Sequence, residues 1–344
     1  MKKVRQVLIV VVICLFAMEI LLRLSGAFKT ASEKTGRGYM SSYGEVHTTW
    51  YNTHKPNDTL IPPATDFQYQ FSTNSIGIRD RDYDYNNTDS VYRILVTGNS
   101  YVEGVGAPYD STWPRLIEKD LHSRNMKVEV IDAGIAGNDI MYDYVLYRDK
   151  LSKYHPNLVI ATMNNSDYVY YTFRGGMDRF HEDGMVHYLA IPWYDFFYHY
   201  SHLFRALLAV SQLPIEGAYL SKNGYKTIAS QATISFAGVL DKYSKLAAKN
   251  DAKFALVIFP KASEIDLNDF LSRNSRNNFE QLSRLLAKDN IPNFNIIGSM
   301  KNKLGRKEKV DFTYAHDGHY KPFGYSVMAQ LTVDSLIRSG IIKP

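Results

Sequence analysis

Short apolar runs alternate with amphipathic segments over most of the chain. Compact runs rich in Val, Ile and Leu predict buried strands at 93–100, 128–134, 157–165, 253–260 and 293–298. Apolar residues at helical spacing predict helices between and after these runs, at 114–125, 142–154, 235–250, 278–290 and 324–340. Strands that alternate with helices are typical of a parallel sheet covered on both faces. We therefore expect an α/β protein, a three-layer α/β/α sandwich around a central parallel sheet.

Two segments interrupt this alternation. Residues 28–90 are rich in Tyr, Asn, Asp and Thr, and their prolines break any helix, so we expect a loop-rich lead-in with short strands such as 66–72. Residues 168–234 form an aromatic-rich insertion, which we interpret as a partly helical, packed cap. A carbohydrate-stacking surface and a docking face for a membrane or a partner are the alternatives. The α/β domain spans 91–344, and we interpret three histidines of the insertion as structural: His187, His199 and His202.

The first apolar run differs from the others because it is long enough to cross a membrane. Residues 7–24 read VLIVVVICLFAMEILLRL, and roughly 20 apolar residues span a bilayer as a helix. Glu19 and Arg23 lie four positions apart, so they can pair on one face of that helix. The basic start MKKVR predicts a cytoplasmic N-terminus. We expect residues 1–27 to be an uncleaved single-pass anchor in the cell membrane, with the C-terminal domain extracytoplasmic. A cleaved signal peptide is the alternative.

Composition and charge exclude several classes of protein and of binding site. The 344 residues are 45% hydrophobic and 22% charged, which is typical of a globular protein and excludes a wholly disordered one. The formal net charge is +5, but Lys2, Lys3 and Arg5 precede the first apolar run, so the remainder is near neutral and we expect no nucleic-acid partner. Cys14 is the only cysteine, which excludes intrachain disulfides and cysteine-rich metal sites. No metal or cofactor spacing occurs, so we expect neither group.

Polar clusters follow the predicted strands at the points where the strands end. A serine follows the first strand, a Gly-rich turn the second and an Asn-rich cluster the third, and DGH lies near the C-terminus. The carboxyl ends of parallel strands meet at one edge of the sheet, where such proteins bind ligands. A serine nucleophile, backbone N–H donors and an imidazole base at one edge are what acyl transfer requires. The G-x-S-x-G elbow of α/β-hydrolases is absent.

Three segments, taken together, resemble the blocks of the SGNH/GDSL hydrolase superfamily in its exported, membrane-anchored bacterial form. GNSYVEG at 98–104 is similar to the first block, DAGIAGN at 132–138 to the second and DGHYKPFGY at 317–325 to the last. NSIGIRDRDY at 74–83 resembles the sequence that precedes the first block in exported members. The resemblance implies a flavodoxin-like SGNH hydrolase fold behind one N-terminal transmembrane helix.

The resemblance also implies roles for individual residues. Ser100 would be the nucleophile, and its N–H would be one oxyanion-hole donor. Gly137 would supply a second N–H donor from a turn glycine. His319 would be the general base and Asp317 the carboxylate that orients it.

Two departures from the family pattern concern the nucleophile and the base. Asn99 stands where the family has Asp, and an amide can still tie that turn. Asp317 lies two residues before His319, whereas the commoner position is three residues before it, where His316 stands. Some polysaccharide acetyltransferases of the superfamily share this Asp-x-His pair.

The third block is the larger departure. Ser166 aligns with the asparagine that donates to the oxyanion in the family. A shift of one or two residues would let Asn165 or Asn164 supply the amide, and the alternative is the Ser166 hydroxyl, a weaker donor. We favour Asn165, with Asn164 buried beneath the turn, because neighbours in a strand point to opposite faces. Glu103, inside the first block, is interpreted as a carboxylate that ties a loop.

The resemblance implies a membrane-tethered, extracytoplasmic serine esterase or O-acyltransferase that acts on acyl esters. By analogy with exported members, we expect the substrate to be O-acetyl groups of a cell-surface glycan and a multi-pass membrane O-acyltransferase to be a partner. The alternative is a catalytically degenerate binding or scaffold subunit of a cell-envelope complex, which the third block motivates. An intracellular lipase-like enzyme does not fit the N-terminal apolar run.

Overall fold

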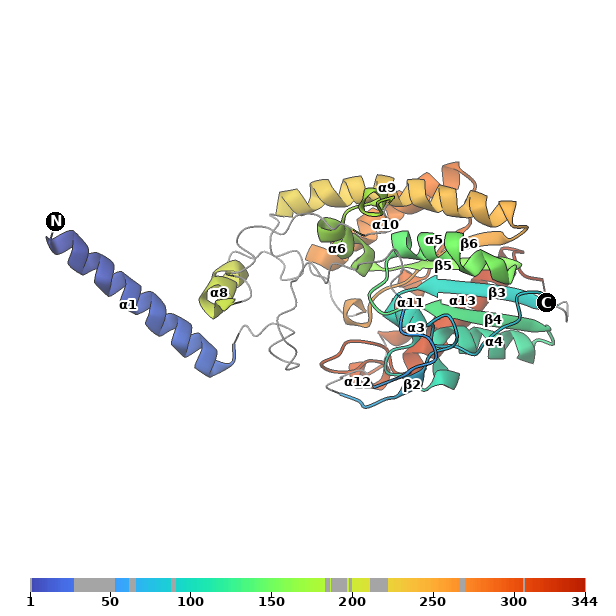
Figure 1. Ribbon diagram of the computed structural model, residues 1–344, viewed down its shortest axis with the longest axis horizontal. Coiled ribbons are helices and arrows are strands. Elements are labelled where there is room, and N and C mark those ends of the chain that lie inside the picture. Colours follow the sequence, from blue (N-terminus) through green and yellow to red (C-terminus); the bar gives the residue numbers. More distant parts are fainter. Residues whose placement is uncertain are drawn as a thin grey trace.

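Five parallel strands form the central sheet (Figure 1). The computed structural model describes residues 2–27, 53–61, 66–87, 91–182, 186, 197, 200–210, 222–265, 270–305 and 307–343. The strands are β3 (Tyr92–Gly98), β4 (Val128–Gly134), β5 (Leu158–Met163), β6 (Lys253–Ile258) and β7 (Asn293–Asn295). They lie in the order β4-β3-β5-β6-β7, which is 2-1-3-4-5 in chain order and therefore flavodoxin-like. The predicted parallel sheet is confirmed.

Helices cover both faces of the sheet, because the side chains of its buried strands alternate between two cores. Leu95 and Val159 point into one core, where α5 (Ile140–Asp149), α6 (Asn165–Arg174), α9 (Lys222–Lys249) and α10 (Phe270–Lys288) pack. Ile94 and Ile160 point into the other, against α3 (Ser100–Glu103), α4 (Trp113–Ser123), α11 (Ile297–Leu304) and α13 (Pro322–Arg338). The predicted three-layer sandwich is confirmed, and Figure 1 shows the two helical layers.

Short helices complete the α/β unit within the described residues. They are α12 (Lys309–Phe312) and four 3₁₀ turns, at Tyr109–Ser111, Leu151–Tyr154, Met177–Arg179 and Ala262–Glu264. The helix predicted over 142–154 ends earlier, and the last of its residues form one of these turns.

The predicted strand 293–298 is wrong in its second half. β7 ends at Asn295, whose side chain accepts a hydrogen bond from the N–H of Ile297 at 3.1 Å and so begins α11. Ile297, Met300 and Leu304 are the buried residues of that helix. Their spacing is helical, so the apolar pair that suggested a continuing strand belongs to the next helix.

The lead-in packs onto the α/β unit. Its two short strands, β1 (Thr59–Leu60) and β2 (Phe71–Ser72), pair antiparallel, so the predicted strand 66–72 is realised only at its end. The buried guanidinium of Arg79 donates to the carbonyls of Glu103 at 3.0 Å, Gly104 at 2.8 Å and Ala107 at 2.7 Å. One lead-in side chain therefore fixes the loop that follows α3.

Helix α1 (Lys2–Ser25) lies apart from the sandwich (Figure 1). The mean hydropathy of its most apolar 18-residue window is 2.8, and α1 is the one helix of the described residues that is long and apolar enough to cross a membrane. Its Glu19 carboxylate accepts hydrogen bonds from the N–H groups of His202 at 3.0 Å and Leu203 at 2.8 Å. Glu19 therefore caps α8 (His202–Val210), the helix that packs beside α1.

Most of the described residues of the insertion are helical, and Phe180 and Val186 form an isolated antiparallel bridge. α6 opens the insertion, α8 lies within it, and α9 begins at Lys222, well before the predicted start at 235. His202 is buried, and its Nδ1 lies 2.7 Å from the carbonyl oxygen of Ala27, which supports the interpretation as a structural residue. His187 and His199 lie outside the described residues.

Candidate active site

The candidate site lies at the carboxyl edge of the sheet, where β3 and β5 are neighbours. After β3 the chain enters α3, which packs on one face of the sheet. After β5 it enters α6, which packs on the other face. Adjacent strands whose connections leave to opposite faces form the crevice in which open α/β sheets bind ligands. Ser100 and Asn165 are the first residues of these two helices.

The turn that presents Ser100 is held by its neighbours. Asn99 is the N-cap of α3, in extended conformation, and its Oδ1 accepts a hydrogen bond from the N–H of Tyr101 at 3.1 Å. The amide thus ties the turn, as expected for this replacement of Asp. At the end of β4, a Cβ on Gly134 would lie only 2.1 Å from the backbone nitrogen of Glu103. A glycine there allows α3 to approach the sheet closely.

His319 lies between Ser100 and Asp317 in a continuous chain of hydrogen bonds. Its Nε2 is 2.7 Å from the Ser100 Oγ, and its Nδ1 is hydrogen-bonded to the Asp317 carboxylate. When Nδ1–H donates to that carboxylate, Nε2 is free to accept the hydroxyl proton of the serine. The ring of Tyr101 packs against the imidazole with 4.8 Å between centroids, and its hydroxyl donates to the Gly318 carbonyl at 3.2 Å. The structure therefore brings together the three residues that the sequence singles out.

The turn before His319 explains the unusual spacing of its carboxylate. Gly318 has a φ of +81°, a left-handed conformation that glycine adopts without strain. Asp317 also accepts a hydrogen bond from the backbone N–H of His319 at 3.2 Å. His316, at the commoner carboxylate position, is 77% exposed, and its Nδ1 lies 2.6 Å from the Asp66 Oδ1. Asp317 rather than His316 therefore contacts the imidazole.

Two backbone N–H groups at the site are free to bind an anion. Within the described part of the chain, the N–H of Ser100 and the N–H of Gly137 donate no hydrogen bond. Gly137 has a φ of +86° in the turn after β4, and it is partly exposed. Free N–H donors beside a serine nucleophile are the elements of an oxyanion hole.

The two asparagines after β5 occupy different positions. Asn164 is fully buried, and its Oδ1 accepts a hydrogen bond from the N–H of Ser166 at 2.8 Å, so its side chain caps α6. Asn165 begins the helix, and its amide nitrogen has no hydrogen-bond partner among the described residues. The buried neighbour agrees with the sequence interpretation, and Asn165 stays the predicted amide donor.

Replacement of Asn165 by alanine tests this donor. We expect Asn165→Ala to lower kcat on an aryl acetate by about 10²–10³-fold with little change in KM, because the amide bonds more strongly to the developing oxyanion than to the ester. Ser166→Ala is the matched control and should keep its kcat. A loss confined to Ser166→Ala would place the donor one residue later, and unchanged kcat in both variants would leave only backbone donors.

Glu103 connects α3 to the turn that contains Gly137. Its Oε2 accepts a hydrogen bond from the N–H of Ala136 at 2.7 Å and lies 2.8 Å from the Nε2 of His54. The side chain of Glu103 is almost fully buried. These contacts agree with the sequence interpretation of Glu103 as a carboxylate that ties loops.

Two arginines of the insertion bind the other side of the turn that contains Gly137. Arg174 donates to the carbonyl of Gly137 at 2.6 Å and pairs with Asp139 at 3.4 Å. Arg179 lies 2.5 Å from the same carboxylate. Burial raises the pKa of Asp139, but the charges of Arg179 and Arg174 outweigh burial and hold it below its usual value. Gly137 is therefore supported by a buried ionic cluster.

Three lead-in residues that the sequence did not single out contact the site loops: His54, Asp66 and Arg79. Only Arg79 lies in a segment that the sequence marks, because residues 74–83 resemble the sequence that precedes the first block in exported members of the superfamily. His54 and Asp66 have no local pattern that marks them.

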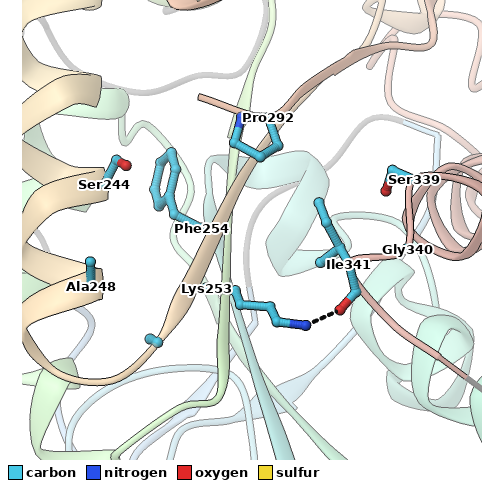
Figure 2. Close-up of a pocket in the computed structure, with 9 residues that line it drawn as sticks. Ser244, Ala248, Lys253, Phe254, Pro292, Ser339, Gly340 and Ile341 are labelled. Carbon is cyan, nitrogen blue, oxygen red and sulfur yellow. Dashed lines mark hydrogen bonds between the residues drawn. The ribbon is translucent and has the colours of Figure 1, made fainter. Parts of the chain in front are cut away.

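A pocket of about 340 Å³, whose lining residues Figure 2 shows, lies at the amino ends of the strands and not at the carboxyl ends that carry the candidate site. It is lined by the start of β6 and by residues from α9 and the C-terminal turn, and Lys253 donates to the carbonyl of Ile341 at 2.6 Å beside it. Because the strands are parallel, the start of β6 lies far from the ends where Ser100 begins α3. No group of His, Cys, Asp or Glu in the described part of the chain is placed to hold a metal ion.

Comparison with known proteins finds similarity in structure only. No family model and no curated protein matches the chain. The solved structures to which it is similar include the psychrotrophic esterase EstA from Pseudoalteromonas sp., at 12% identity and TM-score 0.44, over 73% of this chain and 100% of that chain. They also include a catalytic mutant of Axe2, an acetylxylan esterase from Geobacillus stearothermophilus, at 11% identity and TM-score 0.46, over 71% and 94%.

A third similar structure is the lipase/acylhydrolase from Enterococcus faecalis, at 13% identity and TM-score 0.44, over 74% of this chain and 98% of that chain. Because these TM-scores lie below 0.5, the fold assignment rests on the strand order of the sheet, and the site assignment rests on its hydrogen bonds.

Proposed function

We propose that the protein is a serine esterase or O-acyltransferase of the SGNH/GDSL type that works through an acyl-enzyme. The observation that carries the proposal is the hydrogen-bonded chain from Ser100 through His319 to Asp317, at the switch point of the sheet. The free N–H groups of Ser100 and Gly137 support it. The first two sequence blocks that resemble the family lie at the ends of β3 and β4, and the last block lies between α12 and the start of α13.

The first half of the reaction forms the acyl-enzyme. His319 Nε2 takes the hydroxyl proton of Ser100 as Oγ attacks the acyl carbonyl carbon. The resulting oxyanion accepts hydrogen bonds from the N–H groups of Ser100 and Gly137 and from the amide of Asn165. The tetrahedral intermediate collapses, the imidazolium gives its proton to the departing alkoxide, and the acyl group stays on Oγ.

The second half decides between hydrolysis and transfer. His319 takes a proton from water or from an acceptor hydroxyl, whose oxygen attacks the acyl carbonyl carbon. The bond from that carbon to Ser100 Oγ then breaks, and the imidazolium returns its proton to Oγ, which restores the free serine and the neutral histidine. Water yields a carboxylic acid, and a sugar hydroxyl yields a new ester. Both outcomes use the same residues. We propose that the acyl groups are O-acetyl groups, removed from or added to hydroxyls of a cell-surface glycan, a proposal supported by the family resemblance and by the apolar helix α1.

Covalent labelling tests the proposed chemistry. A fluorophosphonate probe reacts with an activated serine and mimics its acyl-enzyme. We expect the purified full chain to be labelled at Ser100, with labelling lost in Ser100→Ala and kept in Ser166→Ala. Absence of labelling together with absence of aryl-acetate turnover would contradict the enzyme and favour the binding or scaffold subunit.

We also propose that α1 stays attached as a single-pass anchor, with the α/β unit outside the cytoplasm. The contacts of Glu19 with His202 and Leu203 support retention, since cleavage after Ala27 would remove the cap of α8. Export follows from the basic residues that precede the apolar run.

Mass spectrometry of the protein extracted from membranes is expected to find residues 2–27 still attached. A periplasm-active reporter fused after Pro344 should be active, and a cytoplasm-active reporter should be inactive. A mature chain that begins near residue 28 would contradict the anchor and leave the catalytic proposal intact.

A further inference from the structure

A lead-in carboxylate contacts the turn that carries Asp317. The Oδ2 of Asp66 accepts hydrogen bonds from the backbone N–H of Asp317 at 3.0 Å and from that of His316 at 2.6 Å. Its Oδ1 lies 2.6 Å from the Nδ1 of His316. Hydrogen bonds from these two N–H groups and from the His316 ring lower the pKa of Asp66 to about 2, so it is ionised at neutral pH.

The Asp66 contact lies on the Asp317 side of the turn, whereas the His319 side is held by several hydrogen bonds of its own. The His319 side is held by the Thr313–Tyr320 bridge, by the bond from the Thr313 hydroxyl to the His319 carbonyl at 3.0 Å, and by Tyr101. For the backbone N–H of Asp317, the described residues offer one acceptor, the carboxylate of Asp66. The main chain at the triad carboxylate is therefore fixed by a residue from the lead-in.

The residue after Asp66 strengthens the same contact. Phe67 packs on the ring of Tyr314 with 4.3 Å between centroids. The hydroxyl of Tyr314 donates to the carbonyl of Gly106 at 2.7 Å, which joins the turn of Asp317 to the loop that follows the nucleophile. Segment 66–67 thus lies at the junction of the two loops that carry Ser100 and Asp317.

We propose that Asp66 is a positioning residue of the proposed acyl-transfer site, which holds the main chain at Asp317 so that its carboxylate stays on the Nδ1 of His319. The inference rests on the proposed function. Asp66 contacts neither substrate nor the reacting atoms, and it acts only through the geometry of the turn. The titratable groups that face it are His316, Asp317 and Tyr314.

Two substitutions of Asp66 distinguish a positioning role in catalysis from a general effect on stability. Asp66→Ala removes the acceptor, and we expect kcat on an aryl acetate to fall about 10–100-fold with KM unchanged, because a displacement of about 1 Å at a reacting group costs that much. Asp66→Asn keeps an oxygen that accepts from both N–H groups and an amide that donates to the His316 ring, so it should restore most of the kcat. Asp82→Ala is the matched control.

Asp82 lies in the same segment and makes two comparable local bonds, to the N–H of Ser75 at 3.1 Å and its hydroxyl at 2.6 Å. Its variant should keep the wild-type kcat. Equal losses in Asp66→Ala and Asp82→Ala, a wild-type kcat in Asp66→Ala, or a rise in KM without a fall in kcat would each overturn the inference. If Asp66→Ala does not fold, Asp66→Leu replaces it, because leucine keeps the volume but has no acceptor, and a wild-type kcat there would overturn the inference.

The outcome is distinguishable from failure of the proposed function. A wild-type chain that is labelled by fluorophosphonate and turns over aryl acetate keeps the function, whatever the Asp66 variants do. A wild-type chain that fails both assays contradicts the function before the Asp66 variants are compared.

Discussion

Ser100→Ala and His319→Ala are each expected to lower kcat on an aryl acetate by about 10⁴–10⁶-fold. In the proposed mechanism, the serine variant loses the atom that forms the acyl-enzyme, and the histidine variant loses the base, whose Nε2 lies 2.7 Å from that atom. Both side chains are partly exposed at the edge of the sheet, so we expect thermal unfolding to stay close to wild type. Steady-state kinetics and a melting curve on the same preparation check both statements.

The double variant is the control for this prediction. Because the two residues act as a unit, Ser100→Ala with His319→Ala should be scarcely slower than either single variant. Independent losses that multiply in the double variant would contradict a shared role in one step. Near-normal turnover in Ser100→Ala would exclude the acyl-enzyme altogether.

Asp317→Asn is expected to lower kcat by about 10⁴-fold, the loss typical of a triad that is held in the wrong tautomer. An asparagine at this position can turn its amide nitrogen toward Nδ1 of His319, which moves the ring proton to Nε2. A protonated Nε2 no longer accepts the hydroxyl proton of Ser100. The shape of the site is retained, so KM should change little.

His316→Asn is the matched control for the Asp-x-His spacing. His316 points to Asp66 and is largely exposed, so we expect its loss to change kcat far less than the loss of Asp317. Kinetics of the two variants side by side decide which residue serves the base. A larger loss in His316→Asn would mean that the carboxylate on Nδ1 is not the functional one.

The sheet was predictable because each strand is encoded by a short, continuous segment of the sequence. Each buried strand is a continuous apolar run, and β4 has the predicted bounds, 128–134. Ser100, Gly137 and His319 were likewise found from local sequence, since each lies in a short segment of recognisable spacing. Helix limits were less predictable, because α9 begins in the aromatic insertion, where its first residues show no clear periodicity.

The contacts that support the site could not be predicted in the same way. Asp66 is 251 positions from Asp317, and His54 is 49 positions from Glu103. Neither pair leaves a pattern in the segments that contribute it, because a single polar residue in a loop is compatible with many roles. Asn164 and Asn165 remained ambiguous for another reason. A cap and a donor use the same residue type, and only the start of α6 separates them.

The span of the Asp66 contact has a consequence for when the proposed activity can begin. In the proposed topology, the lead-in crosses the membrane first, and the turn of Asp317 follows 251 residues after Asp66. The two parts of the proposed site therefore cannot meet until the turn of Asp317 has been translocated, and contacts of such long range form slowly. A nascent or stalled chain that lacks this turn carries Ser100 without His319, so the proposed acyl chemistry would be confined to chains that have passed this point.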